Sequence, residues 1–200
     1  MKIITQPIFT PSFIVFKNLN LNNQEIIKEL KKLPYEKIHK STEKSVSIKI
    51  LNEIKSGKKI QEEINLCLNV AIKDIWKYDI GHTIVNSWST KTKPGCESTL
   101  HSHKNFWISA VYYPYSERKF KIIFQSDRLD LPSFDINTLE YNCYNSHVWE
   151  YTIDTGDVII FSAALKHKIA MNNTEKTRYS IATNILPKGE IGKDDGTLLI

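Results

Sequence analysis

Three histidines are the residues whose types and spacing offer chemistry in this sequence. His101 and His103 form an H-x-H pair just before a strand-like run, and His167 comes much later, after the strand-like run GDVIIFS. Because residues two apart on an extended chain point to the same side, both imidazoles of the pair can face one point. Imidazole suits Fe, Zn, Cu or Ni. The pattern predicts a metal held by three ligands with open positions, although the histidines alone fit a polar strand end and a surface residue at least equally well.

Arg178 and Ser180 favour the metal site over a chance grouping of histidines. They alternate with Tyr179 and so face one side of a predicted strand. A guanidinium beside a hydroxyl inside a barrel can hold a carboxylate through two parallel hydrogen bonds and a third from the hydroxyl. The alternative is an arginine on the solvent face of an edge strand. Arginine is otherwise rare in this chain, so we expect a carboxylate-binding group close to the metal site.

The amino-terminal part of the chain predicts two helices. The segment Asn23–Leu33 has an asparagine cap at position 22 or 23, and Pro34 ends it. A second helix runs from about Lys58 to Tyr78, where apolar residues recur at every fourth position and form one stripe. A strand-like run, Phe13–Phe16, precedes both helices.

From Gly81 onward, short runs rich in β-branched and aromatic residues alternate with turn residues. Such runs predict strands, and Pro94-Gly95 and Thr155-Gly156-Asp157 predict tight turns between them. The predicted strands are His82–Ser89, Trp107–Tyr113, Phe120–Phe124, Val148–Ile153, Val158–Ser162, Lys168–Met171 and Tyr179–Leu186.

Helices followed by a succession of short strands predict an α+β, mainly β protein: a small antiparallel barrel or jelly roll backed by helices. We expect one domain over residues 1–200, with an N-terminal strand and supporting helices in 1–80, the β core in 81–188 and a tail in 189–200. The segment Ser126–Ser146 lacks periodicity and predicts a long loop over one mouth of the barrel, of the kind that often forms a lid.

The order H-x-H, strand, distal histidine, then R-x-S resembles the 2-oxoglutarate- and Fe(II)-dependent oxygenases. The segments LHSHKNFWISAVYYP, GDVIIFSAALKHKI and RYSIATNILPKGEIG are similar to small oxygenases of tailed phages, cyanophages among them, from about Thr83 to Gly192. The resemblance implies a double-stranded β-helix (jelly-roll, cupin-like) core that binds Fe(II), 2-oxoglutarate and O₂.

Carried over by position, the resemblance makes His101 and His167 iron ligands. Arg178 would hold the far carboxylate of 2-oxoglutarate, with Ser180 as its partner. The core strands of such enzymes also supply cosubstrate contacts, which the resemblance places at Asn86, Trp88 and Tyr112.

His103 departs from the family pattern, which has Asp or Glu at this position. A neutral imidazole there leaves the iron site one unit more positive. His103 is either a third ligand, or a neighbour of the metal with water in the ligand position, or a bystander to a carboxylate such as Glu97 or Asp157. Because the phage subfamily that the chain resembles also carries H-x-H, we favour His103 as a ligand or near-ligand.

The resemblance implies hydroxylation of a C–H bond in a small-molecule or peptidyl substrate, and it leaves a protein side chain, a free amino acid, a nucleobase and a small metabolite open. Two other functions fit part of the pattern. A three-histidine cupin-type dioxygenase that does not use 2-oxoglutarate explains His103 but gives Arg178 and Ser180 no role. A non-enzymatic β-sandwich binding module with structural zinc needs a closed site, whereas only three ligand candidates are present.

The composition of the chain indicates which classes of binding partner to expect. The net charge is +5, but the excess is mostly lysine spread over the first third of the chain, which we expect to form the solvated face of helical stretches. The scarcity of arginine gives nucleic-acid binding no support. No apolar run is long enough to cross a bilayer, and three scattered cysteines predict a reduced, cytoplasmic protein.

Overall fold

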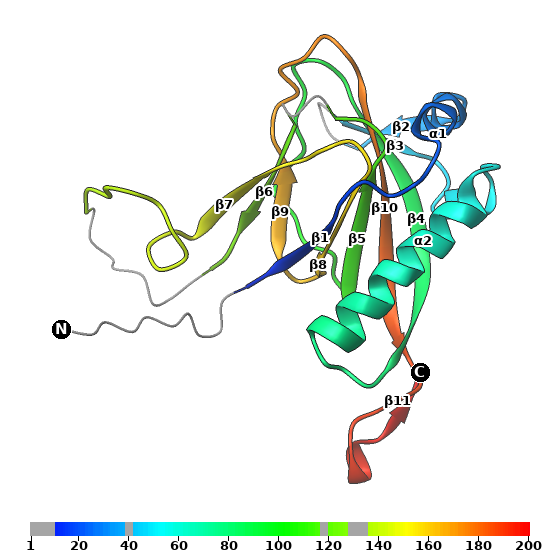
Figure 1. The fold of residues 1–200 in the computed structure, drawn as a ribbon, viewed down its shortest axis with the longest axis vertical. Helices are drawn as coiled ribbons and strands as arrows, with labels where there is room; N and C mark the ends of the chain where they lie inside the picture. Colours follow the sequence, from blue (N-terminus) through cyan, green and yellow to red (C-terminus); the bar gives the residue numbers. More distant parts are fainter. Residues whose placement is uncertain (1–10, 39–41, 117–119, 128–135) are drawn as a thin grey trace.

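A computed structural model describes residues 11–38, 42–116, 120–127 and 136–200. Within these residues the chain forms two main antiparallel sheets packed face to face, with helices against the outer face of the larger sheet (Figure 1), and a separate two-stranded sheet near the C-terminus. In chain order the elements are β1 (Phe13–Phe16), α1 (Asn23–Leu30), β2 (Tyr35–Lys37), β3 (Thr42–Ser45), a 3₁₀ turn η1 (Ile50–Asn52), α2 (Gly57–Asn69), a π-helical turn η2 (Val70–Ile75), β4 (Gly81–Thr92), β5 (Ile108–Tyr113), β6 (Lys121–Gln125), β7 (Val148–Thr152), β8 (Asp157–Ser162), β9 (Lys166–Ile169), β10 (Arg178–Lys188), β11 (Glu190–Ile191), a 3₁₀ turn η3 (Asp194–Gly196) and β12 (Leu198–Leu199).

In the described part of the chain the larger sheet has the order β1-β8-β5-β10-β4-β3-β2, and the smaller sheet has the order β7-β6-β9. Strand β10 lies between β5 and β4 and presents alternate residues to the two sides. Ile181 and Ile185 face the helices, while Ala182 packs with the core between the sheets. Arg178, Ser180 and Asn184 are in phase with Ala182, so β10 presents them to the space between the sheets. The fold class predicted from the sequence, a mainly β jelly roll backed by helices, is confirmed.

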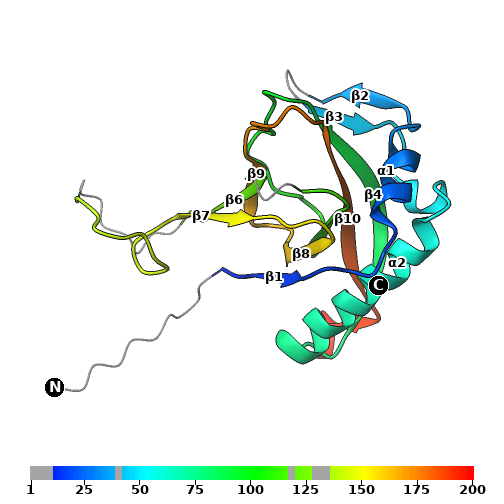
Figure 2. The same cartoon turned by 45° about the horizontal axis from the view of Figure 1, so that its top comes forward.

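The helices cover the face of the large sheet that turns away from the small one (Figure 2). In α1 the Asn22 side chain accepts a hydrogen bond from the Glu25 amide, as predicted for a cap. The helix ends at Leu30 rather than Leu33, because Pro34 disfavours helical geometry at the residue before it and the chain closes with i→i−3 turns. In α2 and η2 the predicted stripe is buried: Ile60, Ile64, Leu68 and Ile72 are fully buried.

Each of the seven strands predicted after Gly81 is present, with ends shifted by up to three residues. The structure adds the hairpin β2–β3, which extends the large sheet beyond β4. Its strands are rich in Lys, Glu and Ser, as is common where a sheet edge must resist pairing with other chains. The expectation that the early lysines lie on helical faces is therefore wrong for Lys37 and Lys44, which are in strands.

The described part of the segment Ser126–Ser146 has no helix or strand, as predicted, and residues 128–135 of it lie outside the description. The predicted turns occur, with positive φ at Gly95 and Gly156. Residues 189–200, predicted as a tail, contain the short hairpin β11–β12. None of the described helices has the length and apolar character needed to cross a membrane.

Candidate metal centre

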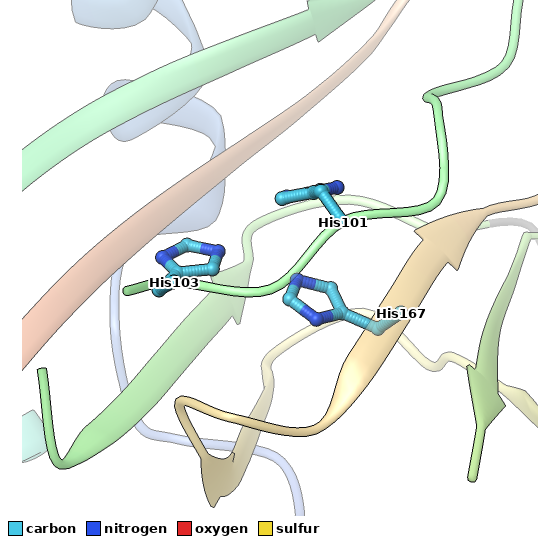
Figure 3. Close-up of side chains that lie close together, drawn as sticks. All are labelled: His101, His103 and His167. Carbon is cyan, nitrogen blue, oxygen red and sulfur yellow. The ribbon is translucent and has the colours of Figure 1, made fainter. Parts of the chain in front are cut away.

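His101, His103 and His167 come together between the two sheets (Figure 3). The His101 amide donates to the His167 carbonyl at 3.0 Å, and the His167 amide donates to the His101 carbonyl at 2.8 Å, which ties the loop before β5 to β9. The His103 amide is held by the Ala163 carbonyl at 2.8 Å. One nitrogen from each ring lies within 4.8 Å of the others, so a single metal ion can reach all three.

Hydrogen bonds fix the tautomer of each ring. His101 Nδ1 lies 2.8 Å from the Thr99 carbonyl oxygen, and His167 Nδ1 lies 3.0 Å from the Leu165 carbonyl oxygen. His103 Nδ1 lies 2.6 Å from the Asn184 side-chain oxygen. Because carbonyl and amide oxygens only accept, each Nδ1 carries the proton and each Nε2 keeps a lone pair. All three imidazoles are thus in the form that binds a metal through Nε2.

Burial keeps the two inner rings neutral. His167 is 5% exposed, and its burial lowers its pKa to about 3. Burial also lowers the pKa of His103. The Nε2 atom of His103 is buried and has no hydrogen-bond partner in the described residues. A buried acceptor without a partner is costly, so this nitrogen fits a site that a metal ion completes.

Arg178 is buried next to residues that line the same space. It is 1% exposed and donates from Nη2 to Thr92 Oγ1 at 3.2 Å, and its guanidinium lies 5.0 Å from the centre of the Phe120 ring. Its Nη1 group and the Tyr113 hydroxyl are both buried without a partner in the described residues. Burial lowers the pKa of Arg178 to about 10, so the guanidinium is charged at neutral pH. No described carboxylate pairs with it.

A narrow cavity runs from the three histidines to Thr92, the residue that accepts the hydrogen bond from Arg178. Its walls include His103, Tyr113 and Ser180, whose hydroxyl is hydrogen-bonded to that of Thr90. Orphaned donors at one end and metal-binding nitrogens at the other fit a ligand with a carboxylate at one end and metal-chelating oxygens at the other. The residues present therefore fit iron and 2-oxoglutarate.

Of the three further cosubstrate contacts predicted from the sequence, the structure brings two to the site. The Trp88 ring stacks on His103 with 5.5 Å between ring centres, and Asn86 lines a cavity beside it. Tyr112 is not at the site: its side chain packs with the helices and its hydroxyl donates to Asn23. Adjacent residues of a strand point to opposite faces, so the tyrosine at the site is Tyr113.

Asn184 is a site residue that the sequence analysis missed. A signal for it was present, because Asn184 is in phase with Arg178 and Ser180 on one strand. The two carboxylates considered as substitutes for His103 are engaged elsewhere. Glu97 pairs with Lys168, and Asp157 pairs with Lys17.

The remaining histidines stand apart from the described cluster. His82, in β4, is hydrogen-bonded to Asn65 of α2, and His147 lines a separate cavity near Trp149. His39 lies outside the described residues.

A wider cavity of about 380 Å³ opens on His101 and His103. Trp88 and Phe106 give it aromatic walls, and the Lys44 ammonium lies 5.8 Å from the centre of the Trp88 ring. Its volume is within the range of small-molecule sites.

Comparison with known proteins agrees with this geometry. Residues 86–184 match the family model described as "Putative 2OG-Fe(II) oxygenase". None of the curated proteins matches the sequence.

Solved structures with this fold include HygX from Streptomyces hygroscopicus with nickel and 2-oxoglutarate bound (TM-score 0.61, 14% identity, 89% of this chain and 84% of that chain). A 2OG-Fe(II) oxygenase family oxidoreductase from Burkholderia pseudomallei is similar (TM-score 0.59, 12% identity, 87% and 84%). So is a prolyl hydroxylase from Trichoplax adhaerens, in complex with a hypoxia inducible factor peptide (TM-score 0.61, 9% identity, 87% and 83%). With the family match, the fold and the cavity between the histidines and Arg178, the chain belongs to the 2-oxoglutarate- and Fe(II)-dependent oxygenases.

Proposed function

We propose that this protein is a hydroxylase whose iron is held by His101, His103 and His167 and whose 2-oxoglutarate is held by Arg178. One observation carries the proposal. Among the described residues four buried side-chain polar atoms lack a hydrogen-bond partner, and three of them belong to His103, Tyr113 and Arg178. Such atoms are rare in folded proteins, and their concentration around one space indicates that a ligand satisfies them.

The chain's own residues bind and orient the reactants. The Nε2 lone pairs of the three histidines would hold the metal. Arg178 and the Tyr113 hydroxyl donate to a carboxylate at the closed end of the narrow cavity, and burial strengthens these bonds. When bound, iron and 2-oxoglutarate supply oxidation of a C–H bond by O₂, with formation of succinate and CO₂.

The substrate enters by the wider cavity. Its position beside His101 and His103 brings a substrate C–H bond next to the metal, and its volume suits a small molecule or a single side chain of a peptide. Trp88 and Phe106 exclude water from the reacting bond. The reaction takes place in the cytoplasm: Cys67 is buried as a thiol, which fits a reducing compartment.

The two rival functions make different demands on the same residues. A dioxygenase that does not use 2-oxoglutarate gives no role to a charged arginine buried without a carboxylate. A structural zinc site closes its shell with a fourth protein ligand, and the described residues supply three around this point.

The decisive experiment is an anaerobic titration of the apoprotein with Fe(II) and then with 2-oxoglutarate, following the weak visible metal-to-ligand charge-transfer band. We expect one iron per chain and a band that saturates with 2-oxoglutarate. In Arg178→Gln the band requires at least about tenfold more 2-oxoglutarate, because a hydrogen bond to a charged group contributes about 1.5–3 kcal/mol. His147→Ala, a histidine variant outside the cluster, serves as the control. Stoichiometric iron without a band would favour the dioxygenase that does not use 2-oxoglutarate, and absence of iron binding would refute the proposal.

A further inference from the structure

The imidazole of His103 is held differently from those of His101 and His167. Their Nδ1–H groups donate to backbone carbonyls, which any residue supplies, whereas His103 donates to the side chain of Asn184. Asn184 is 5% exposed, and its side-chain oxygen also accepts a hydrogen bond from Ser109 Oγ at 3.2 Å. The orientation of His103 therefore depends on the identity of one residue.

This dependence matters because a histidine is a more demanding ligand than the carboxylate that the family usually has at this position. An ionised carboxylate presents lone pairs on both oxygens, whichever way it turns. A neutral imidazole presents one lone pair, and the other nitrogen carries a proton. If the proton were on Nε2, His103 would direct an N–H group at the metal and could not bind it.

The surroundings of Asn184 fix both the proton and the ring. The side-chain oxygen lies 2.6 Å from His103 Nδ1 and receives a second donor from Ser109. Trp88 stacks on the imidazole with 26° between the ring planes, which restricts rotation of the ring. On β10, Asn184 precedes a register shift in the pairing with β4.

We propose that Asn184 is the positioning residue that makes His103 a metal ligand, by holding its proton on Nδ1 and directing Nε2 into the site. The inference rests on the proposed function and adds to it the residue that allows histidine to replace the usual carboxylate. Because Asn184 is an amide, it orients the ring without adding charge. A carboxylate at position 184 would also accept the Nδ1–H bond and would make the imidazole a more basic ligand.

The test compares Asn184→Leu, which removes the acceptor, with Asn184→Asp, which keeps an acceptor of the same shape. Dissociation constants are measured for Co(II) alone and, anaerobically, for Fe(II). Loss of a hydrogen-bond partner behind a metal-binding histidine typically weakens affinity by about 10–100-fold, and we expect this for Asn184→Leu. Asn184→Asp binds at least as tightly as the unmodified protein, and its Fe(II)–2-oxoglutarate band moves to lower energy because the metal is more electron-rich.

Two controls separate positioning from a general structural effect. Asn65→Leu makes the same chemical change at an asparagine of α2 whose side-chain oxygen lies 3.1 Å from Nε2 of His82, a histidine outside the cluster, so affinity for Co(II) stays unchanged. In a His103→Ala background, Asn184→Leu has no further effect on affinity, because the residue acts through His103. Nitrogen-15 shifts of labelled histidine report the tautomer of His103 directly, without a metal.

Unchanged Co(II) affinity and an unchanged His103 tautomer in Asn184→Leu would overturn the inference, as would equal losses in Asn184→Leu and Asn184→Asp. These results differ from those expected if the proposed function itself were wrong. If the protein were not a 2-oxoglutarate-dependent hydroxylase, the unmodified protein would not bind iron or would show no charge-transfer band.

Discussion

His101 and His167 face each other as a hydrogen-bonded antiparallel pair, with backbone N–H···O distances of 3.0 and 2.8 Å. Directly opposed residues of such a pair place their side chains on the same face. Their imidazole centres accordingly lie 4.5 Å apart. Two residues far apart in sequence thus become neighbours through two backbone hydrogen bonds, which tie the loop before β5 to β9.

Because these backbone hydrogen bonds do not involve the imidazoles, they predict the effect of removing one metal-binding side chain. In His167→Ala the other two imidazoles keep their places, so Fe(II) binding persists but weakens by more than about 100-fold, since loss of a mere outer partner already costs 10–100-fold. Anaerobic titration with a competing chelator measures the change. His147→Ala is the matched control and keeps full affinity. Equal affinity of His167→Ala and the unmodified protein would remove His167 from the metal site.

The two adjacent tyrosines of β5 predict opposite effects of the same substitution. Tyr113→Phe removes a buried hydroxyl without a partner in the described residues, so stability is unchanged or rises while 2-oxoglutarate affinity falls by about 3- to 10-fold. Tyr112→Phe removes the hydrogen bond to Asn23, which lowers the free energy of unfolding by about 1 kcal/mol and leaves 2-oxoglutarate affinity unchanged. Urea unfolding and 2-oxoglutarate titration of both variants give the four values. A loss of 2-oxoglutarate affinity in Tyr112→Phe would contradict the assignment.

Glu43 predicts a pH-dependent contribution to stability. Hydrogen bonds from Lys91 and Lys93 hold the pKa of the Glu43 carboxyl below its usual value. A carboxyl whose pKa is lower in the folded than in the unfolded protein stabilises the fold at pH values above the unfolded pKa of about 4.3. This stabilisation is lost as the pH falls through the folded-state pKa. Glu43→Gln therefore lowers the free energy of unfolding by about 1 kcal/mol or less at pH 7, and the difference shrinks as the pH falls below the unfolded pKa.

The check is urea unfolding of Glu43→Gln and the unmodified protein at pH 7 and at a series of lower pH values. Glu62→Gln, an exposed position in α2, is the control for the general effect of removing one carboxylate. A difference that persists at low pH would mean that packing, rather than the ionised carboxylate, is responsible.

The sequence predicted the elements whose apolar residues are periodic. The stripe from Ile60 to Ile72 and the strands β5, β8 and β10 are buried against a core, so their patterns are visible in the sequence. The hairpin β2–β3 was not predicted, because an edge strand needs backbone pairing more than apolar side chains, and Lys and Glu residues hide it. The end of α1 was overestimated because Pro34 acts on the preceding turn as well as on one residue.

The sequence predicted those site residues whose type alone indicates their chemistry. It did not predict the residues whose place at the site depends on which face of a strand they occupy. The three histidines and Arg178 have few structural roles in a core; the histidines line one cavity, and Arg178 bonds to Thr92 in its wall. Tyr112 and Tyr113 differ only in which face of β5 they occupy, and a shift of one residue exchanges the faces. To identify Asn184 as a site residue, one needed to know both which face of β10 it occupies and where His103 lies between the two sheets.

The burial of Arg178 predicts that the protein without 2-oxoglutarate is no more stable than a variant with an apolar side chain at this position. A buried guanidinium with an unpartnered NH1 among the described residues carries a desolvation cost, and an apolar side chain of similar size is often neutral or stabilising in such a place. Arg178→Met therefore unfolds at the same or higher urea concentration than the unmodified apoprotein. With metal and 2-oxoglutarate at about 100 times its dissociation constant, the unmodified protein gains about 2.7 kcal/mol, and Arg178→Met gains much less.

Ile181→Val, on the opposite face of β10, is the control for these measurements. It loses about 1 kcal/mol through reduced packing, with or without 2-oxoglutarate. If Arg178→Met instead lost several kcal/mol as the apoprotein, Arg178 would be part of the structural core. A gain from 2-oxoglutarate equal to that of the unmodified protein would show that the carboxylate is bound elsewhere. Arg178→Met is thus expected to be at least as stable as the unmodified protein without 2-oxoglutarate and less stable with it. This reversal is specific to an arginine whose partner is the cosubstrate.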